Sequence, residues 1–335
     1  MLPGLRNSTI QRTERQPFIS VTKLYLACVL AQIFKGFYIV SAILLTSVVA
    51  AQGTSVSEPL ELAVRKQMSG KAGAVVVLDV DSGKILAQTN LKTAAQRVTA
   101  PGSTLKPFVM LELIERGQVD PEQRMACRRR LTLVGRNMDC THSPAVTNLN
   151  AADAIAYSCN SYFAAAAERL TPAELASALE HAGFTSRTGL SAEEAVGKVV
   201  LAHDLPHQQL QVLGHWGVEV TPLELLGAYR ALALHKLKND LPAAQPVFDG
   251  LERSVQYGMA HSETATSITS AGKTGTAAGA TSAQTHGFFA GYAPADKPEI
   301  VLVVYLEHGR GADAAAIAAP IFAAYAKSKK TGAER

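Results

Sequence analysis

The chain has 335 residues, of which 47% are hydrophobic and 18% charged, so it is long enough for one large domain with a substantial core. Its net charge of +4 is mild and is not gathered into basic tracts, which argues against a nucleic-acid partner. The only dense basic run, Arg128 to Arg130, is predicted to be a solvated face.

Residues 24–51 are apolar apart from Gln32, Lys35 and a few hydroxyl groups. The segment 1–23 that precedes them carries several basic residues. By the positive-inside rule, this pattern predicts a cytoplasmic N-terminus and places the bulk of the chain outside the inner (cell) membrane. We predict a transmembrane anchor at 24–51. A signal peptide cleaved near Val49-Ala-Ala51 is the alternative, and it would give a secreted or periplasmic protein.

The next predicted elements are local. Residues 52–69 are predicted to be a linker followed by an exposed helix from Glu58 to Gln67. A hairpin then follows, with strands at 74–78 and 84–89. The stretch Asp79-Val-Asp-Ser-Gly83 between them has the residues that tight turns favour.

The segment after residue 100 carries the first candidate for chemistry. A Pro-Gly break precedes Ser103, and apolar residues at helical spacing predict a helix that continues to Gly117. Ser103 and Lys106 are three residues apart, so their side chains share one face of that helix. A serine needs an adjacent base to become nucleophilic. A lysine is a base only when neutral, which requires desolvation or a neighbouring positive charge, and Lys273 is a candidate for that charge.

Cys127 and Cys140 are thirteen residues apart and would face an oxidising compartment if the chain is exported. We therefore predict a disulfide between them, worth about 3 kcal/mol, with Cys159 free. Zinc binding by this pair with His142 is an alternative that lacks a fourth ligand, so no metal is predicted.

The string Ser158-Cys-Asn160 is the second candidate. A hydroxyl and an amide two residues apart suit a tight turn that points both side chains into one cleft. The hydroxyl of Ser158 is suited to relay a proton, and the amide of Asn160 to hold Lys106 or a substrate carbonyl. Taken alone, such a string is typical of a helix cap or loop.

The third string, Lys273-Thr-Gly275-Thr276, is predicted to be an edge or cleft-lining strand. Lys273 and Thr274 are suited to bind a carboxylate, and Gly275 would let a substrate backbone lie close. The N–H groups of Thr276 and Ser103 are candidate donors to an oxyanion.

Two other strings resemble known motifs but do not fit them. The end of a P-loop is matched by 272–274, yet the glycine that the motif requires at 267 is Ser267. His203 and His207 have the spacing of a metalloprotease helix, but Pro206 between them is expected to disrupt that helix.

Strands are predicted at 270–276, 287–292 and 299–306, followed by an Ala-rich helix at 312–326 and a frayed tail at 327–335. The region from 104 to about 257 is mainly helical by periodicity. Strands at both ends with helices between them predict an α+β fold: one antiparallel sheet flanked by helices, with an inserted helical subdomain and the cleft at their junction, preceded by the membrane segment.

Together, the three strings supply a nucleophile, a base, a proton relay and an anion-binding strand, as covalent acyl transfer through a serine requires. The chain resembles the transpeptidase domain of the penicillin-binding proteins, relatives of the serine β-lactamases, over about 70–326. Besides the three strings, the resemblance rests on segments 74–87, 101–107, 217–229, 287–294 and 300–305.

The resemblance implies an enzyme without a cofactor that acts on peptidoglycan stem peptides as a D,D-transpeptidase or carboxypeptidase and is acylated by β-lactams. Cell-wall assembly proteins are the protein partners that it implies. The roles carried over are those of Ser103 (acylated nucleophile), Lys106 (base), Ser158 (relay), Asn160 (positioning), Lys273 with Thr274 (carboxylate anchor) and the backbone of Ser103 and Thr276 (oxyanion hole).

Two alternatives to this function are weaker: a serine β-lactamase, and a non-catalytic protein. A class A β-lactamase would carry a Glu-x-x-Leu-Asn segment that activates water, and this sequence has none. A class D enzyme would carry Ser-x-Val where this chain has Ser158-Cys-Asn160. A non-catalytic sensor or scaffold of wall assembly is the third possibility, and the intact motifs argue against it.

Overall fold

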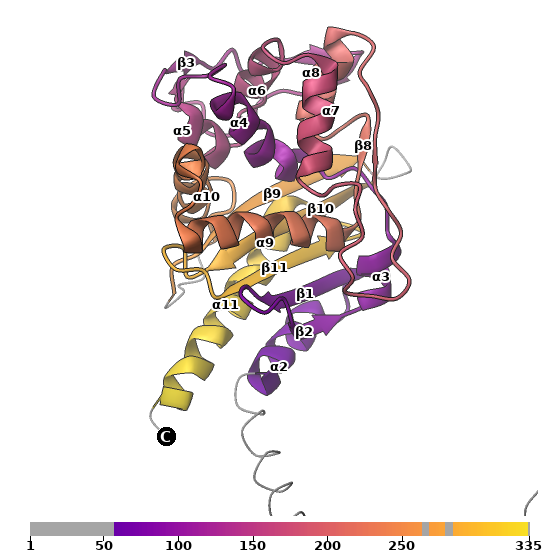
Figure 1. Ribbon diagram of the computed structural model, residues 1–335, viewed down its shortest axis with the longest axis vertical. Coiled ribbons are helices and arrows are strands. Elements are labelled where there is room, and N and C mark those ends of the chain that lie inside the picture. Colours follow the sequence, from indigo (N-terminus) through magenta and orange to yellow (C-terminus); the bar gives the residue numbers. More distant parts are fainter. Residues whose placement is uncertain (1–56, 263–267, 279–283, 334–335) are drawn as a thin grey trace, which may run out of the picture. The chain divides into compact units, whose positions relative to one another are not determined.

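The computed structural model describes residues 57–262, 268–278 and 284–333 (Figure 1). The predicted cytoplasmic segment at 1–23 and the predicted anchor at 24–51 lie outside the described residues. Among the helices that are described, none has the length and apolarity that crossing a bilayer requires.

Five strands form one antiparallel sheet in the order β2-β1-β11-β10-β9. The sheet confirms the predicted arrangement, in which strands from both ends of the domain pair with one another. The strand that contains Lys273 lies at an edge, as the sequence indicates. The strands are β1 (Gly73–Asp79), β2 (Ile85–Thr89), β9 (Ala271–Ala278), β10 (Thr285–Ala293) and β11 (Ile300–Leu306).

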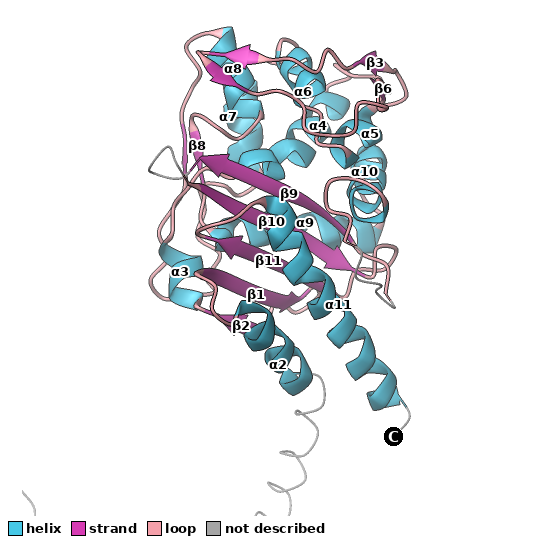
Figure 2. Cartoon of the chain, turned by 180° about the vertical axis from the view of Figure 1, so that it is seen from behind, coloured by secondary structure: helices cyan, strands magenta, loops and turns pink. Residues whose placement is uncertain are grey.

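Helices cover both faces of this sheet. Helix α9 (Pro222–Lys238) lies on the face seen in Figure 1, whereas α2 (Ser57–Met68) and α11 (Gly311–Ala333) lie on the face seen in Figure 2. Alternate residues of β1 therefore enter different buried clusters: Val76 packs on the α9 side and Val75 on the α2 and α11 side. Because both faces are covered, the interior strands β1 and β11 are nearly continuous apolar runs.

Two terminal predictions need correction. Helix α2 is not simply exposed, because Leu60, Val64 and Met68 recur every four residues and are buried. The tail predicted to fray from residue 327 is helical as far as Ala333. The Lys329 ammonium donates to Glu299 at 2.6 Å, a long-range contact that the local sequence does not reveal.

Between β2 and β9 the chain is mainly helical, as predicted, and α4 to α8 lie in the upper part of Figure 1. Three two-stranded pairs accompany the helices. The elements are α3 (Leu91–Gln96), the 3-10 helix η1 (Gly102–Leu105), α4 (Lys106–Glu115), β3 (Met125–Ala126), β4 (Thr132–Leu133), β5 (Arg136–Asn137), β6 (Asn148–Leu149), α5 (Ala151–Ala156), α6 (Asn160–Ala167), α7 (Pro172–His181), β7 (Lys198–Val199), α8 (Leu205–Val212), β8 (Val218–Glu219), η2 (Pro242–Ala244) and α10 (Gln245–Gln256).

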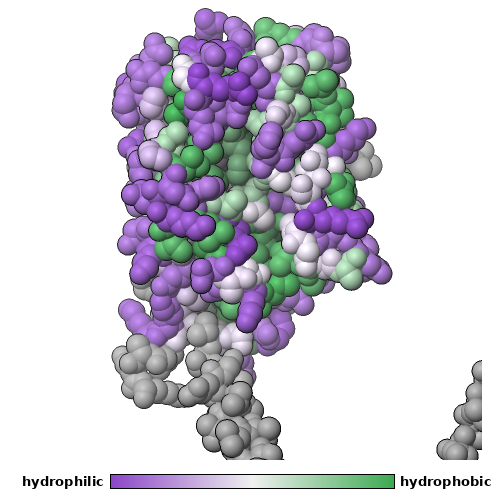
Figure 3. All heavy atoms as spheres, in the orientation of Figure 1, coloured by the Kyte–Doolittle hydropathy of each residue, from purple (hydrophilic) through white to green (hydrophobic). Residues whose placement is uncertain are grey.

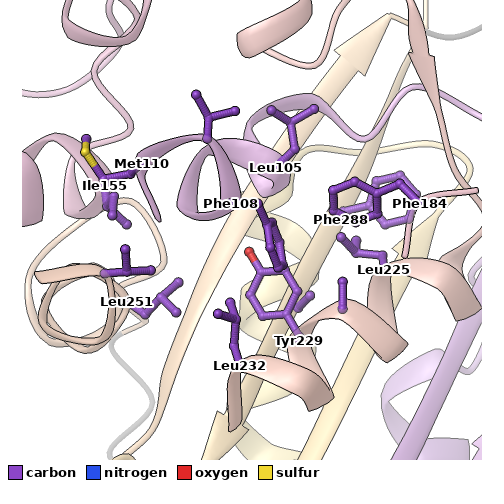
Figure 4. Close-up of a cluster of buried hydrophobic side chains, with 14 of the residues drawn as sticks. Leu105, Phe108, Met110, Ile155, Phe184, Leu225, Tyr229, Leu232, Leu251 and Phe288 are labelled. Carbon is purple, nitrogen blue, oxygen red and sulfur yellow. The ribbon is translucent and has the colours of Figure 1, made fainter. Parts of the chain in front are cut away.

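The core between α4, α9 and the sheet anchors the segment that carries Ser103. Phe108 packs edge-on against both Phe184 and Tyr229, with ring centroids 5.0 and 5.4 Å apart (Figure 4). The buried Tyr229 hydroxyl donates a hydrogen bond of 2.8 Å to the carbonyl of Thr104. On the face drawn in Figure 3 hydrophilic side chains predominate, in keeping with apolar groups gathered in this core.

A pair of matched caps tests how strongly burial matters for α9. Thr221 and Glu224 form a capping box at the start of α9, and Thr171 with Glu174 forms the same box at α7. Thr221 is buried and Thr171 exposed. We expect Thr221→Ala to lower the free energy of unfolding by about 2 kcal/mol and Thr171→Ala by about 1 kcal/mol or less. Denaturant unfolding of both variants measures this, and equal losses would contradict it.

Candidate active site

The predicted helix of Ser103 and Lys106 is divided into two parts. Residues Gly102–Leu105 form a 3-10 turn, and α4 begins at Lys106, whose backbone N–H donates to the Ser103 carbonyl. The two residues still lie one turn apart, as predicted. Ser103 is partly exposed, whereas Lys106 is completely buried.

Glycines allow this turn to close on strand β9. Gly102 has φ +56°, and a Cβ there would lie 2.7 Å from the Thr276 carbonyl oxygen and 2.9 Å from its nitrogen. A Cβ at Gly275 would lie 2.4 Å from the Pro101 oxygen. Ser103 and Thr276 are therefore brought together. Gly275 was expected to make room for substrate, but its open side is filled by the turn.

The Ser158 turn joins α5 to α6. Ser158 has φ +53°, its N–H donates to the Ile155 carbonyl, and the Cys159 N–H donates to the Ala154 carbonyl, the pattern of a Schellman helix end. Glycine is the usual residue at this position, and a serine in left-handed backbone costs about 1–2 kcal/mol. Strain of this kind is concentrated at functional sites.

Lys106 links the two segments. Its Nζ donates to Asn160 Oδ1 at 2.6 Å, to the Ser158 carbonyl at 2.9 Å and to Ser158 Oγ at 3.3 Å. Asn160 is in turn fixed by its Nδ2, which donates to the Met138 carbonyl at 2.9 Å. Lys106 Nζ also lies 5.2 Å from the centre of the Phe163 ring.

Burial determines the protonation of this lysine. Desolvation lowers the pKa of Lys106 to about 7, and the negative charges of Cys159 and Cys140 oppose that shift. Of the two causes considered from the sequence, desolvation is therefore the leading one. Burial, and next the charge of Lys106, hold the pKa of Lys273 well below its usual value.

Strand β9 places its polar groups beside this centre. The Lys273 side chain is fully buried, and its Nζ donates to the Thr274 carbonyl at 3.0 Å. Thr276 Oγ1 accepts a 2.9 Å hydrogen bond from the N–H of Gly311, at the start of α11. Lys273 thus lies inside the domain next to Lys106, rather than reaching out to solvent.

His215 is a neighbour of this centre that sequence reasoning missed. Burial and the charges of Lys106 and Arg136 lower its pKa to about 4, so its imidazole is neutral at pH 7. It lines a pocket of about 330 Å³ with Ala100, Lys198 and Trp216, among others. His215 is brought here by its chain neighbour Gly214, whose carbonyl accepts the Gly102 N–H, and nothing in the local sequence indicates that contact.

The cysteines form a cluster rather than a bonded pair. The Sγ atoms of Cys127 and Cys140 are 3.5 Å apart and unbonded, compared with about 2.05 Å in a disulfide, so the predicted disulfide is not formed in the structure. Cys159, expected to stand apart, has its Sγ 3.7 Å from that of Cys140. His142 Nε2 lies 3.5 Å from the Cys127 sulfur. From the sequence, Cys159 was expected only in the Ser158 turn, so its place in this cluster was not predicted.

The side chains of His203 and His207 also lie close together, on the surface of the domain. Asp204 caps α8 and accepts from His207, while Pro206 lies in the first turn, where it is tolerated. The rings of His203 and His207 are 4.0 Å apart. Pro206 therefore does not disrupt α8 as expected, but His203 precedes the helix, so the two histidines do not lie on one helix.

Among curated proteins, the chain is similar to the peptidoglycan D,D-transpeptidase MrdA of Acinetobacter baumannii, with 25% identity over 351 residues. The match covers 78% of this chain and 52% of that protein, so the chain spans about half the length of the curated relative.

Solved structures share the fold. Penicillin-binding protein 2 of Pseudomonas aeruginosa has a TM-score of 0.69 at 20% identity, covering 81% of this chain and 76% of that one. The transpeptidase domain of penicillin-binding protein 3 from Burkholderia pseudomallei has 0.68 at 22%, covering 83% and 93%. Penicillin-binding protein 2 of Helicobacter pylori, solved in a complex with MreC, has 0.72 at 20%, covering 82% and 63%.

The family model of the penicillin-binding protein transpeptidase domain matches residues 73–327, from the first strand of the sheet through most of α11. This range contains all three strings that the sequence analysis singled out. The chain belongs to the penicillin-binding protein transpeptidase family.

Proposed function

We propose that this protein is a D,D-transpeptidase that acts on peptidoglycan stem peptides through an acyl-enzyme on Ser103. The observation that carries the proposal is Lys106: a buried lysine with a pKa near 7, bonded to Ser158 and Asn160 and one turn from Ser103. A lysine in that state can accept a proton at neutral pH.

The residues divide the reaction between them. Ser103 Oγ attacks the carbonyl carbon of the penultimate D-alanine and gives its proton to Lys106 Nζ. Lys106 Nζ gives this proton to Ser158 Oγ, 3.3 Å away, as that hydroxyl gives its own proton to the leaving amine. The carbon–nitrogen bond breaks, and the terminal D-alanine departs. The acyl group on Ser103 is then taken by an acceptor amine in transpeptidation, or by water in the carboxypeptidase reaction.

Strand β9 and the turn before α4 bind the rest of the substrate in this proposal. The backbone N–H groups of Ser103 and Thr276 stabilise the negative charge on the carbonyl oxygen. Lys273 and Thr274 attract the terminal carboxylate. A carboxylate next to Lys273 would raise the lowered pKa of its ammonium, so that substrate binding itself charges the anchor.

Location and partners follow from the same reading. Residues 24–51 would anchor the protein in the inner membrane, with the catalytic domain outside the cytoplasm. The Helicobacter pylori relative was solved in a complex with MreC. We extend the proposal to a cell-wall assembly protein as a partner of this chain, and to β-lactams as acylating inhibitors.

The release of D-alanine tests the activity. The full chain, incubated with a stem pentapeptide ending in D-Ala-D-Ala, is expected to release the terminal D-alanine. Adding an amine acceptor should divert the acyl group into a cross-linked product. No release of D-alanine with or without acceptor would refute the proposal. Hydrolysis of a chromogenic cephalosporin at many turnovers per second would indicate a β-lactamase instead.

A further inference from the structure

Three side chains of the kinds that bind metals meet at the start of α8. One donor atom from each of His203, Asp204 and His207 lies within 4.8 Å of the other two. Asp204 is the N-cap of the helix, so His203 precedes the helix and His207 belongs to its first turn. Because the three residues are close neighbours in the sequence, the turn before α8 brings them together without help from distant parts of the chain.

The helix cap fixes the carboxylate of this group. Asp204 Oδ1 accepts the backbone N–H of His207 at 2.8 Å and lies 2.6 Å from His207 Nδ1. These two hydrogen bonds lower the pKa of Asp204, so the group is a carboxylate at neutral pH. A carboxylate can only accept, and hence Nδ1 carries the proton in this contact. The structure thus places a negative ligand of fixed orientation directly beside an imidazole.

His203 faces the second oxygen of the same carboxylate. Its Nε2 lies 3.4 Å from Asp204 Oδ2. With metal–nitrogen bonds of about 2.0–2.1 Å and metal–oxygen bonds of about 2.0–2.2 Å, two such ligands of a tetrahedral zinc ion are about 3.4 Å apart. The separation of these two atoms therefore matches the one that a shared ion would give.

Aromatic packing orients the two imidazoles before any ion arrives. The ring centroids of His203 and His207 are 4.0 Å apart, and Trp216 packs edge-on against them at 5.6 and 4.8 Å. The His203 side chain is otherwise exposed, so these ring contacts restrict its rotation. A set of ligands that is already ordered loses less conformational entropy when it binds an ion.

The donors of this group remain available to a ligand. Within the part of the chain that the structure describes, no hydrogen bond to a further residue engages Asp204 Oδ2, the His203 ring or His207 Nε2. The basic run at 128–130 differs in this respect and is not wholly the solvated face predicted. Its half-buried member, Arg129, donates to three backbone carbonyls of its own loop. The group at α8 is therefore open to a ligand where that run is partly closed.

We propose that His203 Nε2, Asp204 Oδ2 and His207 Nδ1 bind one divalent transition-metal ion of the zinc, nickel and copper class. Two imidazoles and one carboxylate favour such ions over Mg²⁺ and Ca²⁺, which prefer oxygen ligands alone. The ion takes the place of the proton on His207 Nδ1. That proton is released and Nε2 takes one up, so the imidazole stays neutral. Three protein ligands leave a fourth position for water, and the site is independent of the proposed acyl transfer.

Trp216 makes the site observable. It is the single tryptophan of the chain, and its ring lies against both histidines. Ni²⁺ is paramagnetic and quenches indole fluorescence at such short range, whereas Zn²⁺ does not. Trp216 also lines the His215 pocket, which the proposed site therefore adjoins.

A fluorescence titration is the first test. The full chain in detergent is titrated with Ni²⁺, and wild type is expected to show quenching that saturates at one site and is reversed by excess Zn²⁺. Asp204→Asn keeps a good helix cap but removes the charge, and His203→Ala removes an exposed ring. Each should raise the Ni²⁺ dissociation constant at least about tenfold. Quenching that never saturates, or that is unchanged in both variants, overturns the site.

His235→Ala is the matched control. His235 Nδ1 lies 2.7 Å from Asp240 Oδ1, as in the contact between His207 and its cap, but the described residues place no third ligand there. Its loss should leave the titration unchanged. If it lowers the affinity as much as the loss of His203 does, the quenching reports general binding to surface histidines, and the assignment fails.

A measurement on wild type alone decides the question even if a variant folds poorly. Diethyl pyrocarbonate modifies accessible imidazoles, and peptide mapping gives the rate at each histidine. Saturating Zn²⁺ should slow the modification of His203 and His207 at least about tenfold, because coordination occupies the reactive lone pair. His235 should react at the same rate with and without the ion. Equal modification of His203 and His207 in both conditions overturns the site.

Discussion

Replacing Ser103 by alanine is expected to abolish covalent labelling of the protein by a fluorescent penicillin. The acyl bond forms to the Ser103 oxygen in the proposed mechanism, and alanine leaves no atom to be acylated. Because Ser103 lies partly exposed near the start of a 3-10 turn, its loss should disturb the fold little. Gel fluorescence after denaturation, with equal protein loaded, measures the label.

Ser177→Ala provides the matched control for this result, since Ser177 lies on α7 and is not part of the proposed site. It should label like wild type. Labelling that persists in Ser103→Ala would place the nucleophile elsewhere. A peptide map of the wild-type adduct would confirm the position, with the mass added to the peptide that contains Ser103.

Replacing Lys106 by methionine is expected to slow acylation by about 10²–10⁴-fold, the usual contribution of a general base. Methionine keeps the length of the side chain and fills the same buried space, so that loss of the base can be separated from loss of packing. Lys92→Met on the surface is the control. Stopped-flow or quench-flow measurements give the acylation rates of the variant and of wild type. The comparison is valid if the two proteins have equal unfolding midpoints.

The pH dependence of the same rate identifies the base. Only neutral Lys106 accepts a proton, and with a pKa near 7 its neutral fraction rises from pH 6 to pH 8. The acylation rate should therefore rise with pH around a midpoint near 7 and level off above it. A midpoint near 10, the value of an exposed lysine, would contradict the assignment, as would a rate that Lys106→Met leaves unchanged.

The sequence predicted what depends on neighbours along the chain. The spacing of Ser103 and Lys106 fixes their shared face whatever lies around them. The predicted strands at 74–78 and 299–306 correspond to β1 and β11, whose apolar runs are continuous in the sequence. Hence the antiparallel sheet, the inserted helices and the three candidate strings could all be found before any contact was known.

Long-range contacts account for the rest. Lys106 packs against Phe163 of α6, far along the chain, so its lowered pKa has no local signal. Cys159 lies both in the active-site turn and in the cysteine cluster. Its neighbours in the sequence indicate only the first of these. His215 comes near Lys106 only because Gly214 packs against the Gly102 turn.

The packing of α2 beside α11 determines which elements bear a force applied at the two ends of the domain. Both helices lie on the same face of the sheet, and the start of α2 and the end of α11 lie at the same side of the domain, away from α4 (Figures 1 and 2). A tension applied between these two ends would therefore load the two helices and the strands under them, and would bypass the catalytic groups. For the same reason, a tag or surface linker attached at the C-terminus leaves the substrate side free, which makes this the preferred point for immobilising the protein.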